Sequence, residues 1–143
     1  MIEFNHYPAQ GTAGEDIKIT IASGPVIIED GQVLLDKHGD NNFWKFPGGR
    51  LCDDNSPRDN ARREAKEELG IAIELTSEPF VVVVERIETG VKNYVILIHY
   101  LAKRLTDQII PGVDILQWAW HDVNNLPADC AENIRLAVEH FKK

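Results

Sequence analysis

A helix with well-marked ends lies in the middle of this chain. Ser56-Pro57 are residues favoured at the cap and first position of a helix, and Gly70 is favoured just beyond the last turn. Between these ends, Ala61, Ala65 and Leu69 recur at every fourth position and form one apolar face. The chain must therefore fold with a helix between Ser56 and Gly70 that packs through this face.

Runs typical of β-strands lie on both sides of this helix. The predicted strands are 17–21, 25–28, 32–35, 79–86, 94–101 and 115–120. Residues 29–32 carry a hairpin signal, and a second turn is expected near 88–90. A last helix has one apolar stripe, formed by Ile134, Ala137, Val138 and Phe141. This order predicts an α/β fold with a mixed sheet between helices.

Length and composition restrict the class of protein further. The chain has 143 residues, of which 43% are hydrophobic, so a single domain over 1–143 is expected. Its 23 acids and 15 bases give a net charge of −8, which argues against coating a nucleic acid polymer. No apolar run approaches the roughly 20 residues that cross a bilayer, and the start lacks signal-peptide character. Because Cys52 and Cys130 are not spaced as a metal or redox pair, we expect reduced thiols and a cytoplasmic protein.

Three carboxylates crowd one side of the central helix. At about 100° per residue, Glu64, Glu67 and Glu68 fall within roughly one third of its circumference. Carboxylates this close repel one another unless a cation or a basic group neutralises them, and Mg²⁺ prefers such oxygen ligands. The alternative is a solvated helix face with ordinary pairs such as Arg63–Glu67. The helix alone does not decide between the two.

The segment before the helix favours a ligand site. Gly48-Gly49 follow a β-like run and shortly precede the helix. Such a loop can fold back over the helix and hold the carboxylates against a ligand, because glycine allows close backbone approach.

Loop and helix together resemble the Nudix box. The run Arg63-Glu64-Ala65-Lys66-Glu67-Glu68-Leu69-Gly70-Ile71, counted from Gly49, is similar to the family pattern at every fixed position but one. The exception is Asn55, where the pattern has its first glutamate. The likeness extends to 44–49 and 120–127, so it covers roughly residues 17–141. It implies an α/β/α sandwich and hydrolysis of a phosphate–phosphate bond in a nucleoside diphosphate derivative.

The resemblance also implies roles for single residues. Glu64, Glu67 and Glu68 would bind Mg²⁺ or Mn²⁺, and Arg63 would orient Glu64. Glu64 is the first choice for the catalytic base, and Asp114 in a later loop is the second.

Substrate contacts are expected around the glycine loop. The candidates are Trp44, Lys45, Gly48, Gly49, Arg50 and Arg86. Trp44, Phe43 and Phe46 could stack on a nucleobase, with core packing an equal alternative for Trp44 and the favoured one for the two Phe. Lys45 and Arg50 could contact phosphate, although a solvated surface position is the simpler reading of each. Three histidines with no shared ligand spacing are assigned no role: His38, His99 and His121.

The leading function is a (deoxy)nucleoside triphosphate pyrophosphohydrolase. The chain is short, and 85–89 contains neither the proline nor the tyrosine that mark ADP-ribose and dinucleoside polyphosphate subfamilies. A nucleotide-sugar pyrophosphatase is one alternative. A nucleotide-binding sensor is another, because Asn55 keeps an oxygen but loses the charge; an acidic interaction domain without metal is a third. The expected partner is a small nucleotide, with no nucleic acid polymer and no membrane, and a homodimer stays open.

Overall fold

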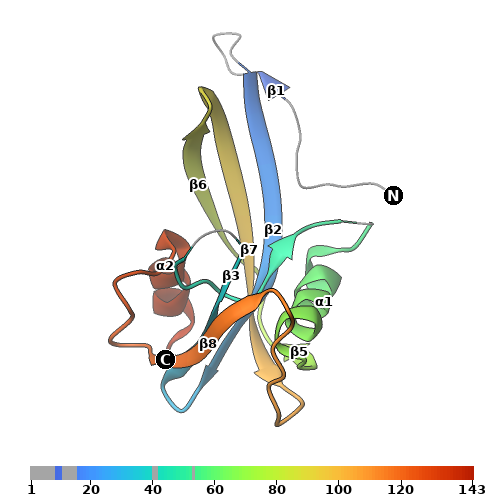
Figure 1. Ribbon diagram of the computed structural model, residues 1–143, viewed down its shortest axis with the longest axis vertical. Helices are drawn as coiled ribbons and strands as arrows, with labels where there is room; N and C mark the ends of the chain where they lie inside the picture. Colours follow the sequence, from blue (N-terminus) through green and yellow to red (C-terminus); the bar gives the residue numbers. More distant parts are fainter. Residues whose placement is uncertain (1–8, 11–15, 40–41, 53) are drawn as a thin grey trace.

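The computed structural model describes residues 9–10, 16–39, 42–52 and 54–143. A mixed sheet runs through this part of the chain, with α1 and α2 on opposite sides of it (Figure 1). The elements are β1 (Ala9–Gln10), β2 (Asp16–Glu29), β3 (Gln32–His38), β4 (Gly49–Arg50), α1 (Pro57–Leu69), β5 (Ile73–Leu75), β6 (Phe80–Glu88), β7 (Val91–Arg104), β8 (Ile115–Asp122) and α2 (Glu132–Phe141).

Helix α1 begins and ends where its capping residues predict. The Ser56 hydroxyl accepts a hydrogen bond of 3.1 Å from the backbone N–H of Asp59, and Pro57 occupies the first turn. Gly70 takes a left-handed conformation, with a φ of 65°, and its N–H donates to carbonyl groups of the last turn. The helix that carries the three glutamates is therefore fixed at both ends by local contacts.

Strand β2 is longer than either of its predicted parts. The runs 17–21 and 25–28 form one strand of 14 residues. The chain stays extended between them because β2 pairs in parallel with β7, with Gly24 opposite His99 and Pro25 opposite Tyr100. Pro25 donates no hydrogen bond to this ladder. A Cβ at Gly24 would clash with the carbonyl oxygen of Pro47.

The predicted turns and long strands are confirmed. Asp30 and Gly31, both with positive φ, connect β2 to the antiparallel strand β3. Thr89 and Gly90 do the same between β6 and β7. The short strands β1, β4 and β5 were not predicted, because two or three residues carry too little periodicity and depend on pairing with β2 or β7.

Two hydrophobic clusters fill the two faces of the sheet. On the side of α2, Val26 packs with Ile134 and Val138; on the side of α1, Ile27 packs with Leu69. Neighbouring residues of β2 thus point to opposite layers, as period-two strands require. The predicted α/β fold with a sandwich around a mixed sheet is confirmed. No helix in the described residues is both long and apolar enough to span a bilayer.

Candidate active site

The glycine loop lies directly on α1. The backbone N–H of Gly48 donates a hydrogen bond of 2.6 Å to Oε1 of Glu68. Gly49 lies against Glu64, and a Cβ at this position would come within 2.7 Å of its Oε1. The loop therefore folds back over the helix as predicted, and Gly49 leaves the space that the Glu64 carboxylate occupies.

A buried amide joins the loop, the sheet and the helix. Asn60 is fully buried, and its Nδ2 donates to the carbonyl oxygen of Gly49 and to Oγ of Ser23, each at 3.0 Å. Its Oδ1 accepts a hydrogen bond of 2.7 Å from Nη2 of Arg63. Asn60 was not predicted, although a signal is present: it lies one turn before Glu64 and so on the carboxylate side of the helix.

Arg63 holds two of the three glutamates. Its Nη2 lies 2.8 Å from Oε1 of Glu64, and its Nη1 lies 2.8 Å from Oε2 of Glu67. The Glu64 side chain is 14% exposed, whereas that of Glu67 is 58% exposed. The expected contact with Glu64 and the ordinary helix pair with Glu67 therefore exist together on one guanidinium group.

Burial and crowding make the inner carboxylates costly to ionise. Burial, and next the charge of Glu68, raise the pKa of Glu64 to about 7. Burial raises the pKa of Glu68 as well, against the opposing effect of its hydrogen bond with His38. A cation beside these two oxygen ligands would relieve both costs.

His38 and Asp36 complete this group, although neither was predicted to take part. Nδ1 of His38 contacts Oδ1 of Asp36 and lies 3.0 Å from Oε2 of Glu68. Burial alone would lower the pKa of His38, but the hydrogen bonds with Asp36 and Glu68 outweigh burial and raise it to about 9. Asp36 is fully buried, and its Oδ2 has no hydrogen-bond partner among the described residues. Ligand atoms of the three side chains lie within 4.8 Å of one another, so the group could hold a metal ion.

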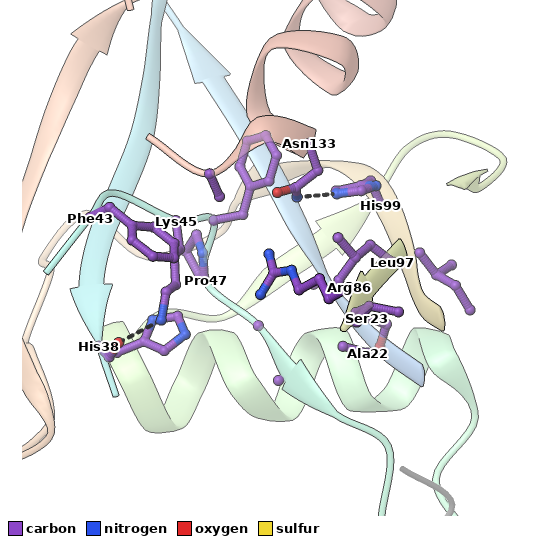
Figure 2. A pocket seen from close by; sticks show the side chains of 17 residues that line it. Ala22, Ser23, His38, Phe43, Lys45, Pro47, Arg86, Leu97, His99 and Asn133 are labelled. Atoms are coloured by element: carbon purple, nitrogen blue, oxygen red, sulfur yellow. Dashed lines mark hydrogen bonds between the residues drawn. The ribbon is translucent and has the colours of Figure 1, made fainter. Parts of the chain in front are cut away.

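Two connected hollows meet at this group. The larger, which we call the acidic cleft, has a volume of about 1110 Å³. The predicted site residues that line it are Glu64, Glu67, Glu68, Asp114, Lys45, Gly48, Gly49, Arg50 and Arg86. The smaller, which we call the apolar pocket, has a volume of about 210 Å³. Its walls include Phe43, Phe46, Pro47, Leu97, His99 and Asn133 (Figure 2).

The two hollows share part of their lining. His38, Lys45 and Arg86 line both, so a ligand in the pocket can extend into the cleft. Lys45 Nζ also donates to the backbone carbonyl of His38, at 2.8 Å (Figure 2).

The aromatic residues before the glycine loop divide between the core and the apolar pocket. Trp44 is 6% exposed, belongs to the core cluster beside α2 and packs edge-on against His121, with ring centroids 4.4 Å apart. It is not among the described residues that line the pocket or the cleft, so the core alternative holds for it. Phe46 is buried in the same core cluster, as expected, and also forms part of the pocket wall. Phe43, expected to be core, is half-buried and lines the pocket. The sequence around this irregular loop did not indicate that Phe43 would line the pocket.

Asn55 is the position at which the chain departs from the family pattern. Its backbone N–H donates to the carbonyl of Cys52, at 3.1 Å, in the turn before α1. It is not among the described residues that line the cleft.

Comparison with known proteins assigns the family. Residues 20–141 match the family model described as NUDIX domain, and the chain belongs to that family. A MutT-like protein of Streptomyces ambofaciens is 35% identical over 75 residues, covering 52% of this chain and 48% of the relative. An 8-oxo-dGTP diphosphatase of Proteus vulgaris is 35% identical over 60 residues, covering 39% and 54%. The chain thus spans about half the length of the curated relatives it matches.

Solved structures show the same fold. The MutT NUDIX hydrolase of Burkholderia pseudomallei superposes with a TM-score of 0.72 at 25% identity, covering 87% of this chain and 98% of that one. An Ap4A hydrolase of C. elegans superposes with a TM-score of 0.68 at 20% identity, covering 85% and 93%.

Proposed function

We propose that this chain is a metal-dependent pyrophosphohydrolase that cleaves a pyrophosphate bond in a (deoxy)nucleoside triphosphate. The observation that carries the proposal is the burial of Glu64 and Glu68 at the wall of one cleft, one held by Arg63 and the other by Gly48. Two acids placed together in this way repel each other unless positive charge neutralises them; Arg63 and His38 supply part of that charge, and a bound cation would supply the rest.

The residues present fit a divalent cation. Glu64, Glu67 and Glu68 offer the hard oxygen ligands that Mg²⁺ and Mn²⁺ prefer, and Gly49 leaves room that a Cβ would fill. Oδ2 of Asp36, which has no hydrogen-bond partner in the described part of the chain, adds a further oxygen nearby. When bound, the cation would neutralise phosphate charge and acidify the attacking water.

The protein's own side chains position and bind. Asn60 and Arg63 keep Glu64 against the loop, so its carboxylate faces the cleft in one orientation. Glu64 is our first choice as acceptor of the proton from water, and the exposed Asp114 at the cleft wall is the second.

Positive side chains line the same cleft. Lys45, Arg50 and Arg86 would neutralise the phosphate oxygens of a bound substrate.

The apolar pocket supports a nucleotide as substrate. Its aromatic and aliphatic walls, with Phe43, Phe46 and Leu97, suit the face of a base, while the shared residues lead a phosphate chain into the cleft. The name of the Proteus vulgaris relative makes oxidised purine triphosphates part of the substrate class to test. We further propose that residues 1–143 form a single domain that acts on small nucleotides in the cytoplasm.

A phosphate-release screen with Mg²⁺ and Mn²⁺ tests the proposal. The panel contains nucleoside triphosphates, 8-oxo-dGTP, nucleotide sugars and ADP-ribose, and compares the natural chain with Glu64→Gln and Glu68→Gln. We expect a substrate-specific signal that falls on the order of 10²-fold or more in both variants. Glu74→Gln, on the exposed part of β5, is the matched control and should retain full activity.

Two outcomes would change the assignment. Full activity in both site variants would place the chemistry elsewhere. No turnover of any substrate, with nucleotide or metal binding retained, would favour the sensor alternative over the enzyme.

A further inference from the structure

His99 and Asn133 meet at the wall of the apolar pocket, apart from the glutamates of α1. His99 lies on β7 and is 3% exposed, and Asn133 lies in the first turn of α2. Nδ1 of His99 lies 3.0 Å from the backbone oxygen of Phe80, and its Nε2 lies 2.9 Å from Nδ2 of Asn133. The sequence gives no spacing that would connect these residues, which come from three elements.

The chain of contacts determines which atoms carry hydrogen. The Phe80 carbonyl can only accept, so Nδ1 of His99 must be the donor. Burial lowers the pKa of His99, which keeps the imidazole neutral and leaves Nε2 as an acceptor. The group of Asn133 that faces Nε2 must then be its amide nitrogen, because the amide oxygen and Nε2 are both acceptors and would repel each other.

We propose that His99 is a positioning residue that fixes the amide of Asn133 with its oxygen toward the apolar pocket, so that the pocket selects ligands presenting an N–H donor. Figure 2 shows the amide nitrogen turned to His99 and the oxygen on the opposite side. The inference rests on the proposed function in one respect, namely that the ligand is the base of a nucleotide.

The surroundings make this orientation selective. The Phe46 ring packs edge-on against the His99 ring at 5.3 Å between centroids, and Leu97 adds an aliphatic wall. In such surroundings an acceptor that finds no donor on the ligand loses the hydrogen bonds it made with water. A base that lacks the donor should therefore bind about tenfold more weakly than a matched base that has it.

The tautomer of His99 can be measured without any turnover. Long-range ¹H–¹⁵N spectra should show a neutral ring with hydrogen on Nδ1. In Asn133→Asp, a carboxylate replaces the amide beside Nε2, and His99 should become doubly protonated at neutral pH. Asn125→Asp, an exposed change of the same charge, should leave the His99 signals unchanged. Hydrogen on Nε2 in the natural protein would overturn the proposal, whether or not the chain is an enzyme.

Comparisons between two bases that differ by one amino group test the selection. Adenine is compared with unsubstituted purine, guanine with hypoxanthine, and cytosine with 2-pyrimidinone, each as the nucleoside triphosphate. At least one pair should differ about tenfold in KM, with a much smaller change in kcat. His99→Phe should remove this preference, while His99→Gln, which keeps a donor and an acceptor, should retain it. His140→Phe, at the exposed histidine stacked on Phe80, is the control.

Failure of this inference differs from failure of the proposed function. If no triphosphate is hydrolysed, the same bases are compared as nucleoside monophosphates by calorimetric binding, which needs no catalysis. Absence of any donor preference in the natural protein, or an equal preference in His99→Phe, would overturn the inference even if Glu64→Gln abolishes hydrolysis.

Discussion

Single buried groups determine how this site is arranged. Periodicity along α1 was enough to predict that Glu64, Glu67 and Glu68 share one side of the helix, because those positions lie within two turns of each other. Periodicity could not bring in Asp36 or His38, which come from the end of β3 and meet Glu68 only through tertiary packing. Local patterns therefore predicted the group of carboxylates on the helix but not the residues that contact them.

Substitution of the buried Asn60 should lower the free energy of unfolding. Asn60→Leu keeps the branched shape of the side chain but leaves the Gly49 carbonyl, Ser23 and Arg63 without this partner. We expect the free energy of unfolding to fall by about 1–3 kcal/mol for an unsatisfied buried group, with lower activity as Arg63 loses its support. Urea unfolding measures this. Asn125→Leu, at an exposed position, should stay within about 0.5 kcal/mol, and an equally small loss in Asn60→Leu would contradict the role.

The two helices are held in different ways. Helix α1 has a side-chain cap at Ser56 and a left-handed glycine at its end, so its bounds were predictable from the sequence. Helix α2 follows Ala131, which provides no side-chain cap, and it depends on the burial of Ile134 and Val138. Strands β4 and β5 depend still more on their neighbours, since they are paired segments with little pattern of their own.

The cap of α1 gives a prediction at this scale. Ser56→Ala removes the acceptor for the Asp59 N–H and should lower the free energy of unfolding by about 1 kcal/mol. Ser56→Asp, which restores a capping oxygen, should recover most of this loss. Thermal unfolding of both variants checks this prediction. Equal stability of Ser56→Ala and the natural protein would show that the cap does not contribute to stability.

Across the whole molecule, the sheet brings distant segments to one place. The acidic cleft depends on α1, while the apolar pocket depends on β2, β7 and the start of α2. The class of fold was predictable from the order of strands and helices, but the junction of cleft and pocket was not, since it requires the parallel pairing of β2 with β7.

The link between β6, β7 and α2 through His99 predicts a pH dependence of stability. Burial lowers the pKa of His99 from its ordinary 6.5. As the pH falls below 6.5, the unfolded chain takes up a proton that the folded protein still resists, so the free energy of unfolding decreases. Above pH 6.5 the contribution of neutral His99 to stability is fully present. The urea midpoint is measured between pH 7.5 and pH 5. As the pH falls, the midpoint should decrease less steeply in His99→Gln than in the natural protein or in the control His140→Gln. Equal slopes in all three proteins would contradict this prediction.

Removal and return of the metal tests the central claim most directly. Release of pyrophosphate or phosphate from the best triphosphate is followed by ³¹P NMR after treatment with EDTA, and again after addition of Mg²⁺ or Mn²⁺. We predict that EDTA abolishes hydrolysis, that either cation restores it in the natural chain and in Glu74→Gln, and that neither restores it in Glu68→Gln. Hydrolysis that survives EDTA, or that returns fully in Glu68→Gln, would contradict a metal-dependent site on α1.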